Sequence, residues 1–80
     1  MGKYIPYSRA KNYAKHRCHR AIVAFERNDV SNEYTAIYAV EEYLRDVHGT
    51  WTAEWNVRKN ELTVYAKDKE TLSYVSMLSG

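Results

Sequence analysis

The stretch AKNYAKHRCHRAI, residues 10–22, holds the densest group of chemically active side chains in the sequence. It contains two histidines, two lysines, two arginines and the only cysteine of the chain. These residue types fit three kinds of chemistry. Histidine and cysteine bind zinc, a cysteine beside cations can act as a nucleophile, and clustered cations bind phosphates. Spacing decides among them.

The spacing argues against a metal site. Structural zinc takes about four ligands, usually supplied by two separate pairs of residues. On a helix, Cys18 points roughly 160° away from His16, so these two side chains cannot share one ion. The remaining histidine, His48, belongs to a different predicted element. We therefore expect no metal and no other cofactor.

Catalysis has equally little support in the sequence. The helical pattern turns Cys18 toward the interior, where a thiol is a small core residue rather than a nucleophile. With only three glycines, the chain has no glycine-rich phosphate loop. The carboxylates of Glu41, Glu42 and Asp46 fit an exposed helix face. We expect that the protein is not an enzyme.

Hydrophobic periodicity predicts the elements that position these residues. A single α+β domain spans 1–80, because a chain of 80 residues supports one core. Residues 1–7 form an extended basic arm ending near the only proline. A first helix runs from an N-cap at Ser8 to about Arg27, with small residues along its buried side. Ser31 or Asn32 caps a second helix.

The second helix buries Ile37, Val40, Leu44 and Val47 and ends at Gly49. Alternating apolar residues then predict two strands, 51–57 and 62–67, joined by a turn in which Asn60 takes a positive φ. Asp68 caps a last helix, 69–78. The predicted order is α-α-β-β-α, with a two-stranded antiparallel hairpin packed on helices. Its edges, or a helix face, could join a second copy into a homodimer.

Charge is distributed unevenly along the chain. The net charge is only +2, but residues 1–20 hold six Lys and Arg and no acid, whereas all ten acids follow. Such asymmetry favours a polyanionic partner for the basic segment, either nucleic acid or an acidic protein surface. The candidate contacts are Lys3, Arg9, Lys11, Tyr13, Lys15, His16, Arg17, His19 and Arg20. Tyrosine at position 13 could stack on an unpaired base.

A second hypothesis uses the tyrosines. Eight tyrosines exceed what so small a core can hold, and tyrosine is a common anchor of protein interfaces. The chain would then be an adaptor or stoichiometric inhibitor, of the kind found among bacteriophage accessory proteins. It would act on a larger machine, such as one that processes nucleic acid. The interface residues under this hypothesis are Tyr38, Glu41, Glu42, Tyr43 and Arg45.

The sequence also predicts a compartment. One cysteine cannot form an internal disulfide, which argues against a disulfide-stapled secreted domain. No apolar run approaches the ~18 residues of a membrane span, and the first residues lack the apolar stretch of a signal peptide. A cytoplasmic protein without membrane contact is expected.

Overall fold

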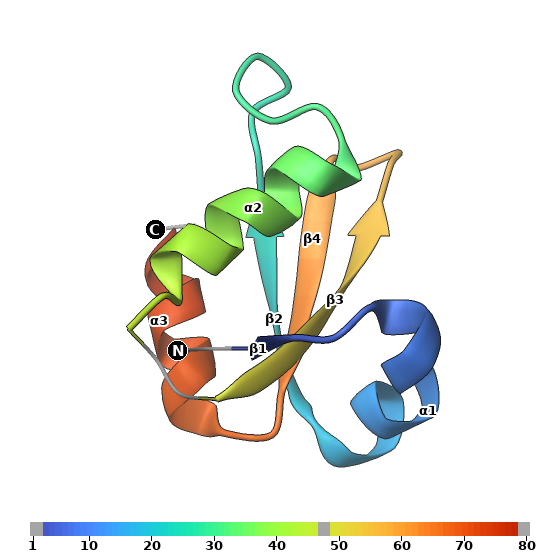
Figure 1. Cartoon of the computed structure of the whole chain (residues 1–80). Helices are drawn as coiled ribbons and strands as arrows, with labels where there is room; N and C mark the ends of the chain where they lie inside the picture. The colour runs from blue at the N-terminus through green and yellow to red at the C-terminus, as the bar shows by residue number, and fades with distance from the viewer. Residues whose placement is uncertain (1–2, 47–48, 79–80) are drawn as a thin grey trace.

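The computed structural model describes residues 3–46 and 49–78 (Figure 1). Within them the chain is a small α+β domain with three helices and a mixed four-stranded sheet. The order is β1 (Lys3–Tyr4), α1 (Tyr7–Arg17), β2 (His19–Ala24), α2 (Glu33–Tyr43), β3 (Thr50–Asn56), β4 (Glu61–Ala66) and α3 (Lys69–Leu78). The predicted α+β class is confirmed. The predicted order was wrong because it missed β1 and β2.

The first helix is much shorter than the sequence pattern suggested. α1 begins at Tyr7, directly after Pro6, so Ser8 lies inside the helix and does not cap it. Cys18 has an extended backbone, with φ −115° and ψ 152°, and ends the helix. The following residues include Ile22 and Val23, whose branched side chains favour strands. Val23 did not fit the predicted helix face, and it is buried in the core as part of β2.

The predicted hairpin is confirmed and forms the centre of the sheet. The strand order is β1-β3-β4-β2, in which β3 and β2 are antiparallel to β4 and β1 is parallel to β3. Asn60 closes the hairpin turn with φ 55°, which confirms the positive φ predicted for it. The hairpin's two edges, expected to face a second copy, are instead flanked by β1 and β2 of the same chain.

One face of the sheet carries the core. Side chains from β3, β4, α2 and α3 share this core, with Trp51, Ala53, Leu62, Val64, Ala66, Val40, Leu44, Leu72 and Val75 buried. Asn32 caps α2, because its side chain accepts a hydrogen bond of 2.9 Å from the Thr35 N–H. α2 ends at Tyr43, earlier than predicted, and Gly49 does not have the positive φ of a helix-ending glycine. Val47, a predicted core residue, lies outside the described residues.

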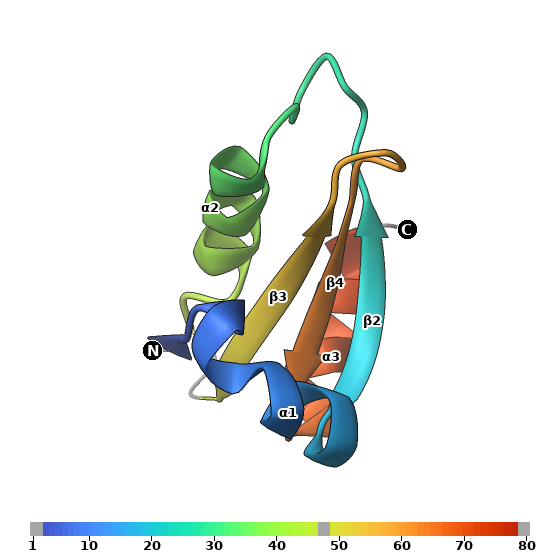
Figure 2. The ribbon, with the colours of Figure 1, turned by 90° about the vertical axis from the view of Figure 1, so that its right-hand side faces the viewer.

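α1 lies on the opposite face of the sheet from α3. Figure 2 shows α1 in front of the lower ends of the strands and α3 behind them. α1 packs on β3 and β4, and Thr52 and Tyr65 are buried on this face. The sequence pattern assigned residues 19–24 to the first helix, whereas the structure places these six residues in β2.

Candidate polyanion-binding site

All nine residues predicted to contact a polyanion are exposed. This holds for Lys3, Arg9, Lys11, Tyr13, Lys15, His16, Arg17, His19 and Arg20. They do not form one helix face, however, because the helix ends at Arg17 and the last two residues belong to β2. The structure therefore regroups them into separate places.

Three of these residues meet where α1 gives way to β2. Lys15, His19 and Arg20 line an open depression together with Ala14, Cys18 and Tyr65. The extended backbone at Cys18 turns the chain so that the end of the helix and the start of the strand face the same space. A depression lined by three basic side chains is a suitable place for an anionic group.

Lys67 lies beside this depression, and no pattern in the sequence indicated that it belongs there. It follows β4 directly, and its neighbour Ala66 pairs with His19. The Lys67 Nζ lies 6.0 Å from the centroid of the Tyr13 ring, within the range of a cation–π contact. We define the basic cluster as Lys15, His19, Arg20 and Lys67. Lys67 comes close to the other three residues only because β2 pairs with β4, and β2 was not predicted.

No residue of the basic cluster has an ion-pair partner in the part of the chain that the structure describes. Among residues 3–46 and 49–78, the one ion pair is that of Arg45 with Glu42, at 3.9 Å on α2. Tyr65, on the floor of the depression, has a raised pKa, mainly because it is buried. Among the smaller influences on this pKa, the negative charge of Glu54 raises it further and the positive charge of Arg20 lowers it. Arg20 and Glu54 therefore both act on the depression.

Four of the other predicted contacts do not line this depression. Lys11 borders a different depression, which Glu33 and Glu54 also line. Lys3 lies on β1, the edge strand at the other side of the sheet. His16 and Arg17 lie at the end of α1 and are exposed. These residues widen the positive surface but do not share the depression.

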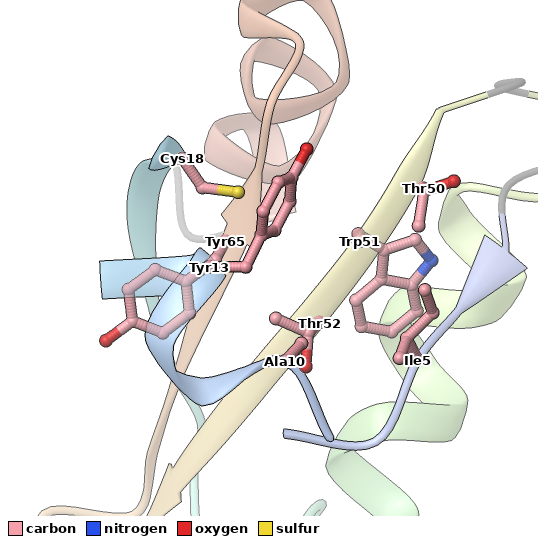
Figure 3. Close-up of a pocket in the computed structure, with 8 residues that line it drawn as sticks. All are labelled: Ile5, Ala10, Tyr13, Cys18, Thr50, Trp51, Thr52 and Tyr65. Atoms are coloured by element: carbon pink, nitrogen blue, oxygen red, sulfur yellow. The ribbon is translucent and has the colours of Figure 1, made fainter. Parts of the chain in front are cut away.

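Cys18 lies in a small, mainly apolar pocket between α1 and the sheet. Figure 3 shows the residues that line this pocket, which come from β3 and β4 as well as from α1 and the segments that flank it. Burial raises the pKa of the Cys18 thiol, and the nearby charge of Lys67 opposes the rise. The thiol is therefore protonated at neutral pH, as suits a packing residue. Within the part of the chain that the structure describes, no three His, Cys, Asp or Glu residues form a metal-binding group; His48 lies outside it.

The second predicted surface lies on α2 and just beyond its end. Its residues Tyr38, Glu41, Glu42, Tyr43 and Arg45 are all exposed. Tyr38 is 64% exposed, and Tyr34, one turn earlier, is 84% exposed. The spacing of four between Tyr34 and Tyr38 places both rings on one side of the helix. Tyr43 is five residues from Tyr38 and so lies off that side.

Comparison with known proteins gives no relative. No family model, no curated protein and no solved structure matches the chain. In the described part of the chain, none of the helices is long and apolar enough to cross a membrane.

Proposed function

We propose that this protein is a non-enzymatic nucleic-acid-binding protein that holds phosphates in the basic cluster. The observation that carries the proposal is that Lys15, His19 and Arg20 line one open depression, with Lys67 close by at the end of β4. Among residues 3–46 and 49–78 none of the four has an ion-pair partner. The positive charges of Lys15, Arg20 and Lys67, held together in this way, repel one another. A phosphate backbone would relieve that repulsion and release its own condensed counterions.

Tyr13 favours a single-stranded ligand. Its ring is 43% exposed and lies beside Lys67. An aromatic face next to phosphate-binding cations can stack an unpaired base while the backbone follows the charges. Arg9, His16 and Arg17 on α1 extend the positive surface along the strand of nucleic acid. The proposed role needs no cofactor, and its proposed setting is the cytoplasm.

Titration of fluorescently labelled single-stranded and double-stranded DNA and RNA, read by anisotropy, tests this function. Lys15→Glu and Lys67→Glu should each raise the dissociation constant by about tenfold or more, because each reverses one charged phosphate contact. Lys59→Glu is the matched control. Lys59 is exposed in the β3–β4 turn, at the other end of the sheet from α1 (Figure 2). Lys59→Glu changes the net charge of the chain by the same amount as Lys15→Glu or Lys67→Glu.

The outcome separates a local site from general attraction. If Lys59→Glu weakened binding as much as Lys15→Glu, the protein would attract nucleic acid only through its net charge, and the basic cluster would not be a site. If the wild-type chain bound none of the four nucleic acids even at low salt, the proposed function would be wrong.

A protein partner is the second candidate, and the exposure of Tyr34 and Tyr38 on α2 favours it. Two large rings one turn apart, beside the acidic Glu41 and Glu42, form a surface suited to a basic partner. The chain would then act as an adaptor or stoichiometric inhibitor. Tyr38→Ala should abolish that interaction while leaving nucleic-acid binding unchanged. Capture of partners by wild-type and Tyr38→Ala protein from the native host, compared at moderate salt, tests this alternative.

A further inference from the structure

The outer edge of β2 exposes an uninterrupted row of backbone groups. β2 pairs with β4 from His19–Ala66 to Ala24–Glu61 without a bulge. One residue further in the same register, the Phe25 N–H donates a hydrogen bond of 3.1 Å to the Asn60 carbonyl. Hydrogen-bonded pairs alternate in an antiparallel ladder. The N–H and C=O groups of residues 20, 22 and 24 therefore point away from β4.

The side chains on this edge are suited to further pairing. Ile22 stands at the middle of the strand and is 52% exposed. The strand contains no proline or lysine, two residues that commonly protect an edge. Figure 2 shows that α1 covers only the lower ends of the strands on its face of the sheet. Ile22 and Ala24 belong to that face by their register and are both exposed. An exposed, regular edge of this kind is a template for another strand.

We propose that β2 pairs with β2 of a second copy of this chain, antiparallel and about a twofold axis at Ile22. The free backbone groups of the two copies meet only where an even-numbered residue of one copy lies opposite an even-numbered residue of the other. In the register centred on Ile22, residues 20, 22 and 24 of one copy lie opposite residues 24, 22 and 20 of the other. In the next allowed register in either direction, one of these three residues has no partner within β2 of the second copy. Ile22 then contacts Ile22 of the second copy, which covers both exposed side chains.

Charge complementarity selects the same register. Arg20 lies opposite Ala24 of the second copy, and Ala24 pairs with Glu61 on the next strand. Arg20 and that Glu61 therefore lie on one face of the joined sheet, two strand spacings or about 10 Å apart. The small side chain of Ala24 leaves the space between them open. In the described residues neither Arg20 nor Glu61 has an ion-pair partner, and the twofold axis creates this pair twice.

Self-complementarity is the reason for choosing a second copy over an unrelated strand. An isologous interface needs each element to meet its own counterpart, and here the apolar residue is central while opposite charges lie at symmetric ends. The joined sheet runs continuously through both copies. Arg20 belongs to both the basic cluster and this interface, whereas Lys15, His19 and Lys67 take no part in the interface. The test below is made without nucleic acid, so its outcome does not depend on the proposed nucleic-acid binding.

Sedimentation equilibrium of the full chain, without nucleic acid, tests the proposal. Over a concentration series the mean mass should rise from the 9.4 kDa of one chain toward twice that value. Ile22→Pro removes an outward N–H and no hydrogen bond of the β2–β4 ladder. It should raise the dimer dissociation constant about tenfold or more, with the circular dichroism spectrum unchanged. Ile22→Val, which keeps the N–H, is the matched control and should dimerise.

A charge exchange tests the register and does not rely on the proline variant folding. Arg20→Glu and Glu61→Arg should each weaken the dimer, and the double variant should restore it because the ion pairs re-form with reversed sign. A chain that stays monomeric throughout the series would overturn the proposal. A natively folded Ile22→Pro variant that dimerises like the wild type would also overturn it, as would a double variant weaker than either single one.

Discussion

Asn60 connects the hairpin turn to the segment after β2, and its replacement should lower stability strongly. The residue is 3% exposed and has φ 55°. Its side-chain Nδ2 donates to the Phe25 carbonyl at 2.9 Å and to the Val30 carbonyl at 2.7 Å. Asn60→Gly keeps the backbone conformation, since glycine adopts positive φ freely, but removes both donors. The substitution therefore isolates the two hydrogen bonds.

The expected loss follows from those two bonds. Each is worth about 0.5–1.5 kcal/mol, and the bond to Val30 is buried, so its carbonyl would be left without a donor at a further penalty of about 1 kcal/mol or more. The sum is about 2–4 kcal/mol, against a total stability of about 4–12 kcal/mol for a domain of this size. The melting temperature should fall by roughly 8–30 °C. Asn60→Ala should lose about 1–2 kcal/mol more, because alanine is strained at positive φ.

Thermal and urea unfolding, followed by circular dichroism, measure these differences. Lys59→Ala is the control, because it changes an exposed side chain in the same turn and should shift stability by less than about 0.5 kcal/mol. An Asn60→Gly variant as stable as Lys59→Ala would refute the reasoning. An Asn60→Ala variant that is no less stable than Asn60→Gly would also refute the reasoning, because it would show that the positive φ at position 60 does not strain alanine.

Three further predictions concern packing and ionisation. Gly49→Ala should destabilise the chain because the added Cβ would collide with the Thr71 Oγ1. In a double-mutant cycle with Thr71→Ala, measured by urea unfolding, the losses of stability of the two single variants should not be additive. Burial raises the pKa of Tyr65 above its ordinary 10.0. Between pH 10 and the raised pKa, the native state therefore binds more protons than the unfolded state. The contribution of Tyr65 to the free energy of unfolding should be fully present below pH 10 and be lost as the pH rises further, and Tyr65→Phe should reduce the slope of that free energy against pH. Burial also raises the pKa of Cys18, so at neutral pH a thiol reagent should modify the native chain more slowly than the urea-unfolded chain; equal rates would contradict the packing described for this residue.

The sequence predicted the elements that carry strong local signals. The alternation around Trp51 and Leu62 indicated the hairpin, and Asn60 indicated its turn. Asn32 indicated the start of α2 through its capping side chain. In each of these cases the residue that directs the structure acts on neighbours within a few positions, so one sequence is enough to identify it.

The missed strands depend on contacts between distant segments. β2 was assigned to the first helix because Ala21 and Phe25 continued the apolar stripe of α1. Its pairing with β4, more than 35 positions away, decides its conformation. β1 is only two residues long and exists through its pairing with β3. Lys67 joined the basic cluster for the same reason, since it follows the strand that pairs with β2.

The exposed residues of the basic segment were predicted more easily than their arrangement. All nine candidates are exposed, as is usual for lysine and arginine side chains, which make up six of them. Their grouping could not be predicted, because it depends on the extended backbone at Cys18 that ends α1. This single change of conformation converts one helical face into the depression between α1 and β2.

The salt dependence of single-stranded nucleic-acid binding tests the central claim most directly. The account predicts that the logarithm of the binding constant falls linearly with the logarithm of salt concentration, with a slope of about −0.7 for each phosphate neutralised. Lys15→Gln should reduce the steepness of that slope by the contribution of about one phosphate, whereas Lys59→Gln should leave it unchanged. Equal slopes for the wild-type chain and Lys15→Gln would show that the basic cluster does not hold phosphates.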